Sequence, residues 1–310
     1  MRCCVIGGSG FIGAHVTRML GLTDREVVVL GRRVKAETQF PPRVRYVAGD
    51  FGNPSYLERV LRGVDEIVHL AYSTVPRTSF EDPVFDLLSN LPSTVQLFQA
   101  AVSAGVSKVV LVSSGGTVYG STNRLPIAED HPTNPISPYG ITKLTLEKYA
   151  SMFHVTLGLP VVIVRPANAY GEEQRANGGQ GFVAAAMHSI LRGREVTLFG
   201  PIGTIRDYIH VSDVAGGIVA ALDRGSIGEI YNIGTGVGRN NLEVLAEIEP
   251  HAYRAGFPIL TEILPTRAYD VPANVLDSGK LTAIAGWSPQ VEFATGIERV
   301  WQALSSSQPA

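Results

Sequence analysis

The sequence predicts an α/β protein, with a doubly wound parallel sheet and a smaller α/β lobe toward the C-terminus. Three observations predict this fold. Short apolar runs alternate with stretches of helical spacing through the first two thirds of the chain. A glycine-rich segment directly follows the first apolar run. After Pro166 the sequence pattern changes and predicts loops, shorter helices and shorter strands.

The apolar runs predict strands that are buried on both faces, because they are rich in Val, Ile and Leu and lack polar alternation. These strands are Cys3–Ile6, Glu26–Leu30, Glu66–Leu70, Val109–Val112 and Val161–Val164. Helical spacing between them predicts the helices Phe11–Leu20, Pro54–Leu61, Pro83–Ala104 and Ile141–Leu157. Strands that alternate with helices in this way are typical of a doubly wound sheet.

Beyond Pro166 we expect a loop over Asn168–Gly181 and a late strand over Glu229–Ile233 that rejoins the sheet. Between these two segments we expect the helix Gly181–Gly193, the strand Val196–Phe199 and the helix Val211–Arg224. The predicted sheet domain comprises residues 1–166 and about 207–235. The predicted lobe comprises residues 167–206 and 236–304, and residues 305–310 are a predicted disordered tail.

Composition restricts the partners and the compartment. The net charge is −2 and there is no basic stripe, so we expect no nucleic-acid partner. Cys3 and Cys4 are the only cysteines, and adjacent strand residues face opposite ways, so neither a disulfide framework nor a metal site is predicted. We expect no signal peptide, because glycines interrupt the first apolar run at once, and no apolar run reaches about 20 residues. We expect a cytoplasmic protein without a membrane partner.

Gly7, Gly10 and Gly13 follow the first predicted strand and open the first predicted helix. Glycines at this spacing permit a tight turn and let backbone N–H groups approach a pyrophosphate at the positive end of the helix. We therefore predict a Rossmann-type dinucleotide site that also includes Phe11 and Ile12. The alternative is a glycine-rich turn without a ligand.

The end of the second predicted strand bears on the choice of dinucleotide. An acidic residue near Gly31 is typical of NAD-preferring proteins, but Arg32 and Arg33 follow here. Either arginine could bind a 2′-phosphate, so NADP is slightly favoured over NAD. The alternative is that both are solvated loop residues.

Further cofactor contacts are predicted after two other strands. Asp50 and Phe51 follow the apolar run Val44–Val47, where the Asp50 carboxylate could accept from an adenine amino group or cap the helix starting near Pro54. Leu70 ends the predicted strand Glu66–Leu70, and Ala71 follows it. These two residues complete the predicted cofactor contacts.

Tyr139 and Lys143 form a Y-x-x-x-K pattern. On a helix these two positions share a face. A Lys143 ammonium beside the phenol favours the phenolate and lowers a pKa that is ordinarily about 10. Both residues are also candidate cofactor contacts, because Lys143 can hold the nicotinamide ribose.

Five motifs occur in order between residue 7 and about residue 277: the glycine motif, Ser113–Gly120, Pro138–Lys143, Arg165–Gly171 and Gly203–Val211. On these motifs the sequence resembles the UDP-glucose 4-epimerase group of extended short-chain dehydrogenases/reductases. The resemblance implies an NAD(P)-dependent enzyme that epimerises a nucleotide sugar, most simply a UDP-hexose, by transient oxidation at C4. It also implies a homodimer.

The resemblance assigns substrate contacts. Asn168 and Arg206 match positions that contact the nucleotide diphosphate, and Arg267 resembles a later phosphate-binding arginine. Arginine forks suit phosphate, which agrees with these roles. The alternatives are a loop turn for Asn168 and a surface ion pair with Asp207 for Arg206. His210 is expected to be structural.

The resemblance also makes Tyr139 the general base and Lys143 its electrostatic partner. One departure concerns the proton relay, because the family's catalytic Ser or Thr position falls at Gly115, which has no hydroxyl. Thr117 is our first candidate to replace it and Ser114 the second. Residues three apart on a strand edge face opposite ways, so only one of them can serve.

Related activities make different demands on the same segment. Family 4,6-dehydratases carry an Asp-Glu pair at the places of Gly116 and Thr117, and related decarboxylases also carry an acid there, but this chain has none. An NADPH-dependent 4-ketoreductase remains a candidate because of the Arg32-Arg33 pair. A catalytically silent dinucleotide-binding sensor is the candidate from another class, and the Tyr139–Lys143 pattern argues against it.

Overall fold

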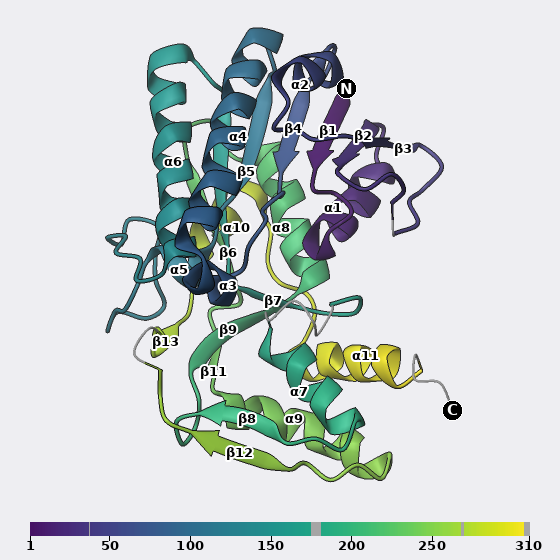
Figure 1. Cartoon of the computed structure of the whole chain (residues 1–310), viewed down its shortest axis with the longest axis vertical. Coiled ribbons are helices and arrows are strands. Elements are labelled where there is room, and N and C mark those ends of the chain that lie inside the picture. Colours follow the sequence, from purple (N-terminus) through teal and green to yellow (C-terminus); the bar gives the residue numbers. More distant parts are fainter. Residues whose placement is uncertain (37, 175–180, 268–269, 307–310) are drawn as a thin grey trace.

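A seven-stranded parallel sheet forms the centre of the larger part of the molecule, in the order β3-β2-β1-β4-β5-β6-β10 (Figure 1). The computed structural model describes residues 1–36, 38–174, 181–267 and 270–306. The strands are β1 (Arg2–Ile6), β2 (Glu26–Gly31), β3 (Val44–Ala48), β4 (Glu66–His69), β5 (Lys108–Val112), β6 (Val161–Pro166) and β10 (Ile230–Ile233). The sheet confirms the predicted fold class, and β10 is the late strand that was expected to rejoin it.

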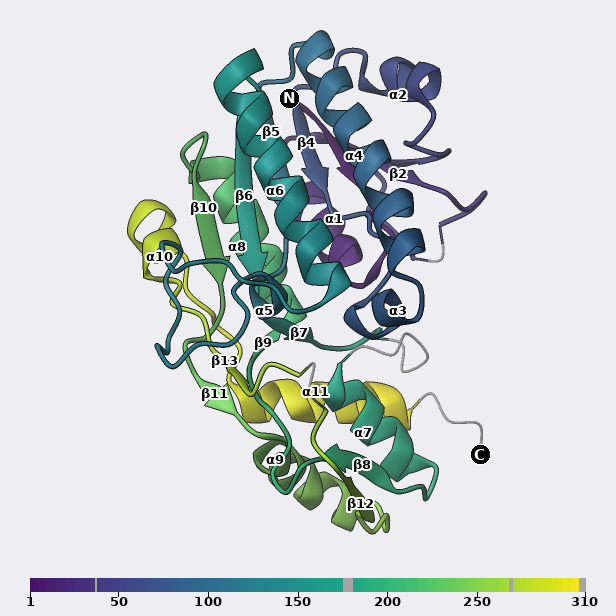
Figure 2. The same cartoon turned by 60° about the vertical axis from the view of Figure 1, so that its left-hand side comes forward.

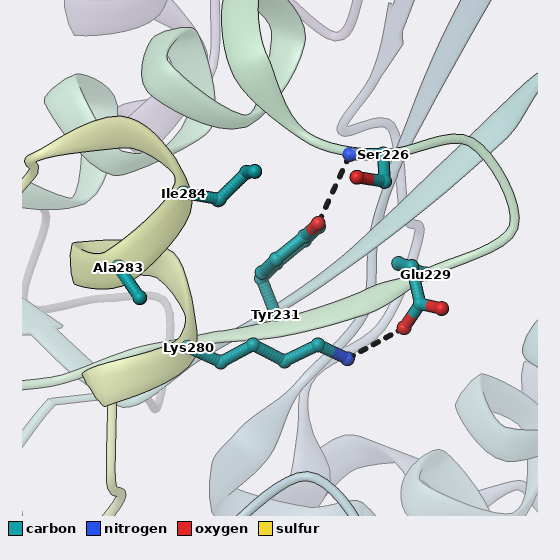
Figure 3. A pocket seen from close by; sticks show the side chains of 6 residues that line it. All are labelled: Ser226, Glu229, Tyr231, Lys280, Ala283 and Ile284. Carbon is teal, nitrogen blue, oxygen red and sulfur yellow. Dashed lines mark hydrogen bonds and ion pairs between the residues drawn. The ribbon is translucent and has the colours of Figure 1, made fainter.

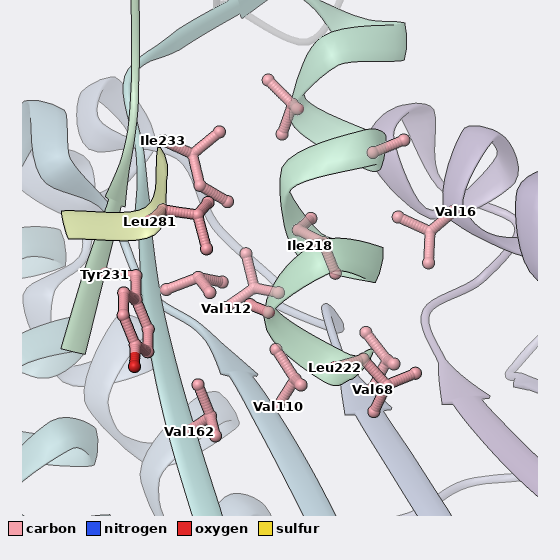
Figure 4. Close-up of a cluster of buried hydrophobic side chains, with 14 of the residues drawn as sticks. Val16, Val68, Val110, Val112, Val162, Ile218, Leu222, Tyr231, Ile233 and Leu281 are labelled. Atoms are coloured by element: carbon pink, nitrogen blue, oxygen red, sulfur yellow. The ribbon is translucent and has the colours of Figure 1, made fainter. Parts of the chain in front are cut away.

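Helices cover both faces of this sheet. One face carries α1 (Phe11–Gly21), α8 (Val211–Arg224) and α10 (Gly279–Ala285). The other carries α2 (Pro54–Leu61), α4 (Pro83–Ala104) and α6 (Pro138–Leu157). Cys3 packs in the first core cluster and Cys4 in the second, as expected for neighbours on a buried strand. Figure 4 shows Val110 and Val112 of the sheet beside Ile218 of α8 in the first cluster.

The chain leaves β1 in one direction along the sheet toward β2 and β3, and crosses to the other side at β4. Ligands of open α/β sheets bind at such a crossing, outside the carboxyl ends of the strands. Two short helices lie just after strand ends at this edge: α3 (Pro76–Glu81) follows β4, and α5 (Gly115–Val118) follows β5.

The second lobe lies beyond the carboxyl edge of the sheet in both views (Figures 1 and 2). Its strands are β7 (Asn168–Tyr170), β8 (Val196–Phe199), β9 (Ile205–His210), β11 (Gly238–Arg239), β12 (Thr261–Leu264) and β13 (Ala273–Asn274). Its helices are α7 (Phe182–Leu191), α9 (Asn241–Arg254) and α11 (Phe293–Ser305). The lobe has its own apolar core, made largely by these three helices. The predicted domain boundaries stay a prediction.

Two expectations about local structure were wrong. Residues 168–170 were expected in a loop but form β7, because their backbone pairs with β9, with Asn168 opposite Tyr208. Ser305 was assigned to a disordered tail but ends α11, which is held by the buried side chains of Val300 and Trp301. Residues 307–310 of that predicted tail lie outside the described residues. Within the described part of the chain, no helix has the length and apolar character that a membrane crossing requires.

Candidate active site

The glycine-rich turn lies at the carboxyl end of β1, against the loop that follows β4. Gly7 has a φ of 84°, and a Cβ built on it would lie 2.7 Å from the Ala71 backbone nitrogen. A Cβ on Gly13 would lie 2.2 Å from the Gly7 carbonyl oxygen. The turn therefore requires glycine at both positions. The Leu70 and Ala71 amides both donate to the Ile6 carbonyl, which keeps this loop beside the turn.

The first turn of α1 is suited to an anion. Its N-cap, Gly10, provides no side-chain cap, and the first turn, which includes Phe11 and Ile12, contains no acidic residue. The first N–H groups of a helix lack intrahelical partners and carry a partial positive charge. A bare N-terminus behind a close-packed glycine turn fits the pyrophosphate of a dinucleotide.

The ends of β2 and β3 lie side by side at the same edge, because the Gly49 amide donates to the Gly31 carbonyl. Arg32 is exposed, and the Tyr46 hydroxyl donates to the Arg33 carbonyl at 2.8 Å. Arg32 and Arg33 therefore directly follow the end of β2, and a contact of either with a 2′-phosphate stays a prediction.

Asp50 and Phe51 follow β3. The Asp50 carboxylate accepts from the Gly52 amide at 2.9 Å. The alternative that Asp50 caps α2 is wrong, because Asn53 is the cap and accepts from the Tyr56 amide. Phe51 packs edge-on against His69 at the end of β4, with 5.3 Å between ring centroids.

The start of α6 sets the position of the two candidate catalytic residues. Ser137 caps the helix by accepting from the Gly140 amide at 3.1 Å, and proline follows at the first position. The Tyr139 amide donates to the Ser79 hydroxyl of α3 at 3.1 Å. The Lys143 ammonium donates to the Val112 carbonyl of β5 at 3.0 Å. Both Tyr139 and Lys143 are buried at the carboxyl edge of the sheet.

The protonation behaviour of this pair differs from the sequence argument. Burial raises the pKa of Tyr139, whereas the hydrogen bond with Ser114 lowers it. Burial also lowers the pKa of Lys143 to about 7. The Lys143 nitrogen lies 5.7 Å from the Tyr139 ring centroid and is turned toward Val112. In this arrangement Ser114, rather than Lys143, stabilises the phenolate.

The segment holding the two relay candidates is helical, so the argument from a strand edge does not apply. Ser114 directly precedes α5 and is hydrogen-bonded to Tyr139. The Thr117 hydroxyl oxygen is buried and has no hydrogen-bond partner within the described residues. A Cβ on Gly115 would lie 2.4 Å from Leu276 Cδ1, so the family's hydroxyl residue does not fit there without rearrangement.

Asn168 and Arg206 lie on neighbouring strands of the second lobe. Asn168 belongs to β7 rather than to a loop turn, and its side-chain oxygen would lie 3.1 Å from a Cβ on Gly116. Arg206 on β9 donates to the Ile205 carbonyl at 2.8 Å. Asp207 instead accepts from Thr235, so the alternative of an Arg206–Asp207 ion pair is wrong.

Arg206 and Arg267 lie close enough to influence each other. Burial lowers the pKa of Arg206, and the positive charge of Arg267 lowers it further. Arg267 is paired with Asp270 at 2.8 Å and lies over the Phe199 ring, 3.8 Å from its centroid. Two guanidinium groups this close together suit a multiply charged anion, and the predicted phosphate-binding role of both stays a prediction.

His210 has a structural part, as expected. It caps α8 by accepting from the Ser212 amide and lies 3.0 Å from the Glu172 carboxylate.

A separate pocket lies at the other end of the sheet, beside the amino end of β10 (Figure 3). It is lined by Ser226, Glu229, Tyr231, Lys280, Ala283 and Ile284. Lys280 is paired there with Glu229 at 2.7 Å. This pocket is therefore remote from the candidate catalytic residues.

Sequence reasoning missed three residues of the site. Ser79 anchors the Tyr139 amide, and the Tyr72 ring lies 4.9 Å from the Tyr139 ring. Asn274 donates from its side chain to the Gly115 carbonyl at 3.0 Å. None belongs to the motifs used above. For Tyr72 the one available signal was its place directly after Leu70 and Ala71.

Known proteins resemble the chain along nearly all of its length. Residues 3–234 match the NAD dependent epimerase/dehydratase family. The UDP-glucose 4-epimerase of Mycolicibacterium smegmatis is 35% identical over 306 residues, covering 96% of this chain and 97% of that protein. The Thermus thermophilus UDP-glucose 4-epimerase, solved in complex with NAD, is 34% identical with a TM-score of 0.90, covering 99% of this chain and 100% of the other. A dTDP-glucose 4,6-dehydratase from Actinoplanes is 32% identical, covering 96% of this chain and 95% of that protein.

Proposed function

The chain belongs to the NAD dependent epimerase/dehydratase family, and we propose that it is an NAD(P)-dependent 4-epimerase of a UDP-hexose. The observation that carries this proposal is the pairing of Tyr139 with Ser114 at the sheet edge, beside an α5 segment without any carboxylate. The name shared by the M. smegmatis and T. thermophilus relatives supports the same activity.

In the proposed reaction Tyr139 takes the proton of the sugar 4-hydroxyl. A dinucleotide held at the Gly7–Gly13 turn would supply the chemistry of reversible hydride transfer at C4. Arg206, Arg267 and Asn168 hold the diphosphate, so the sugar can turn about its link to a fixed anchor while C4 is a ketone. Tyr139 then gives the proton back to the C4 oxygen, and the overall reaction is redox-neutral. The chain supplies positioning and a general base.

The residues of the α5 segment distinguish this activity from dehydration. A 4,6-dehydratase is among the relatives, at 32% identity. Elimination of water from the sugar requires an additional acid and base near C5 and C6. Gly116 and Thr117 occupy the segment in question, and neither can donate or accept as a carboxyl group does. A silent sensor is disfavoured because it would not need Tyr139 and Lys143 buried together at the sheet edge.

We further propose that Ser114 relays the proton of Tyr139 and that Thr117 contacts the sugar. Ser114→Ala should therefore lower kcat by about tenfold or more, since one tenfold step corresponds to about 1.4 kcal/mol in the barrier. Thr117→Val should raise KM more than it lowers kcat. Steady-state kinetics of both variants test the assignment. If Thr117→Val loses kcat while Ser114→Ala is near wild type, the relay belongs to Thr117, as the sequence alone favoured.

NADP is the slightly favoured cofactor in this proposal, because Arg32 is exposed beside the end of β2 and no acid follows Gly31. Arg32→Ala should weaken NADP binding by about 10- to 100-fold, the range for losing a hydrogen bond to a charged group, and NAD binding much less. Calorimetric titration with both dinucleotides measures this. Arg43→Ala, an exposed arginine before β3, is the charge-matched control. Equal losses for both cofactors would make Arg32 a solvated loop residue.

Epimerisation is tested with a 4-deuterated UDP-hexose and no added dinucleotide. An epimerase converts the sugar to its C4 epimer with deuterium retained at C4, because the hydrogen removed is the hydrogen returned. The second candidate, an NADPH-dependent 4-ketoreductase, is favoured by the Arg32-Arg33 pair. No epimer, together with oxidation of added NADPH by a 4-keto sugar, would assign the chain to reduction.

A homodimer through α4 and α6 is also part of this proposal. These helices pack side by side (Figure 2), and both expose apolar side chains: Val84, Phe85 and Leu88 on α4, and Val155 and Leu157 on α6. Exposed apolar side chains on two neighbouring helices favour association with a second copy. We propose a cytoplasmic location as well, where the buried Cys3 and Cys4 thiols stay reduced.

A further inference from the structure

A buried carboxylate lies beside the candidate catalytic pair, and the proposed reaction does not use it. Asp86 of α4 has no exposed surface. It accepts from the Thr142 hydroxyl at 2.6 Å and from the Thr74 hydroxyl. The Tyr72 hydroxyl makes a longer contact, at 3.4 Å and 3.5 Å to the two carboxylate oxygens. A buried carboxylate requires such donors, and here they join α4, α6 and the loop after β4.

Tyr72 connects this carboxylate to the catalytic residues. Its ring lies under the Lys143 ammonium, with the nitrogen 4.1 Å from the ring centroid. The same ring packs edge-on against Tyr139, with 4.9 Å between centroids. Because Lys143 also donates to the Val112 carbonyl at 3.0 Å, the ammonium is held between a carbonyl oxygen and an aromatic face.

We propose that Tyr72 is a positioning residue that holds the Lys143 ammonium against its ring, and that Asp86 fixes the ring by accepting from its hydroxyl. An ammonium within about 6 Å of a ring centroid is attracted by the negative face of the ring, most strongly where water is excluded. Nothing in the glycine or Tyr-Lys motifs requires a ring at this place. The effect on turnover rests on the proposed function, whereas the effect on Lys143 does not.

Four groups face the Lys143 ammonium besides Tyr72: Asp86 on α4, Glu147 and Tyr139 on α6, and His69 on β4. Burial lowers the pKa of Lys143 to about 7, while Glu147 and Asp86 raise it. Burial also lowers the pKa of His69 to about 3 and raises that of Tyr139. Of the groups with a shifted pKa around this ammonium, Lys143 itself is therefore the one that titrates near neutrality.

The test compares Tyr72→Leu, which removes the ring, with Tyr72→Phe, which keeps it. Tyr253→Leu, at an 83% exposed tyrosine of α9, is the matched control. The first readout is the affinity for NAD(P) between pH 6 and 9, which needs no sugar. We expect the charged form of Lys143 to hold the ribose, so affinity should be present below the Lys143 pKa and fall as pH rises through it. Tyr72→Leu should move this midpoint down by roughly 0.5–1 pH unit, because the ring favours the charged form.

The second readout is turnover of the UDP-hexose. Tyr72→Leu should lower kcat by about tenfold with KM within about twofold, and Tyr72→Phe should restore kcat to within about threefold of wild type. Asp86→Asn should lower kcat no more than Tyr72→Phe does, because both changes weaken the same hydroxyl–carboxylate contact and keep the ring. The melting temperature of both Tyr72 variants should be unchanged.

Each outcome decides the proposal. A midpoint that stays in place or moves to higher pH in Tyr72→Leu overturns it, as does equal loss of kcat in Tyr72→Leu and Tyr72→Phe. If wild type forms no epimer, the proposed function fails, but the midpoint measurement still tests Tyr72 alone.

Discussion

Tyr139→Phe is expected to lower kcat by about 100- to 10,000-fold, the range for losing a general acid–base group. The phenol is buried at the sheet edge, hydrogen-bonded to Ser114 and one helical turn from Lys143. Phenylalanine keeps the ring, so its edge-on packing against Tyr72 is retained. Binding of the dinucleotide should therefore stay within a few-fold of wild type.

Turnover is measured with the deuterated sugar, and dinucleotide affinity by calorimetry. Tyr253→Phe, a change of the same kind at an exposed position of α9, should be as active as wild type. A Tyr139→Phe variant that keeps full turnover would remove Tyr139 from the mechanism. Loss of cofactor binding together with turnover would instead mean that the substitution disturbs the start of α6.

Glu147→Ala should produce the largest loss of stability. The Glu147 carboxylate forms a two-point ion pair with Arg165, at 3.0 Å and 2.6 Å, and both side chains are almost fully buried. It also accepts from the Ser113 hydroxyl. Removing one partner of a buried ion pair leaves the other charge uncompensated, which costs about 3–5 kcal/mol of unfolding free energy.

Denaturant unfolding of Glu147→Ala measures this loss. Glu247→Ala, on the exposed side of α9, is the control and should change stability by no more than about 0.5 kcal/mol. The double variant Glu147→Leu with Arg165→Met should recover much of the stability, since apolar side chains of similar size can replace a buried ion pair. A loss below about 1 kcal/mol for Glu147→Ala would mean that Arg165 finds another partner or water.

The sequence by itself determined the doubly wound parallel sheet, apart from its number of strands, and the place of the glycine-rich turn. Strands buried on both faces, such as Val109–Val112, must be apolar at every position, so they are visible without knowledge of their neighbours. The Gly13 position is equally local, because a Cβ there would meet the Gly7 carbonyl oxygen of the same turn, and Gly7 itself has a φ of 84° that favours glycine. Tyr139 and Lys143 were found because positions i and i+4 of a helix share a face in any context.

Only the tertiary structure decided how these parts act together. Ser114 rather than Thr117 lies against Tyr139 because α5 is helical, and burial reverses the expected direction of the Tyr139 pKa. β7 exists only through its pairing with β9. The contact of Tyr72 with Lys143 joins a loop and a helix whose residues are far apart in the sequence. Such contacts depend on distance in space and on exclusion of water, and the periodicity of a single segment predicts neither.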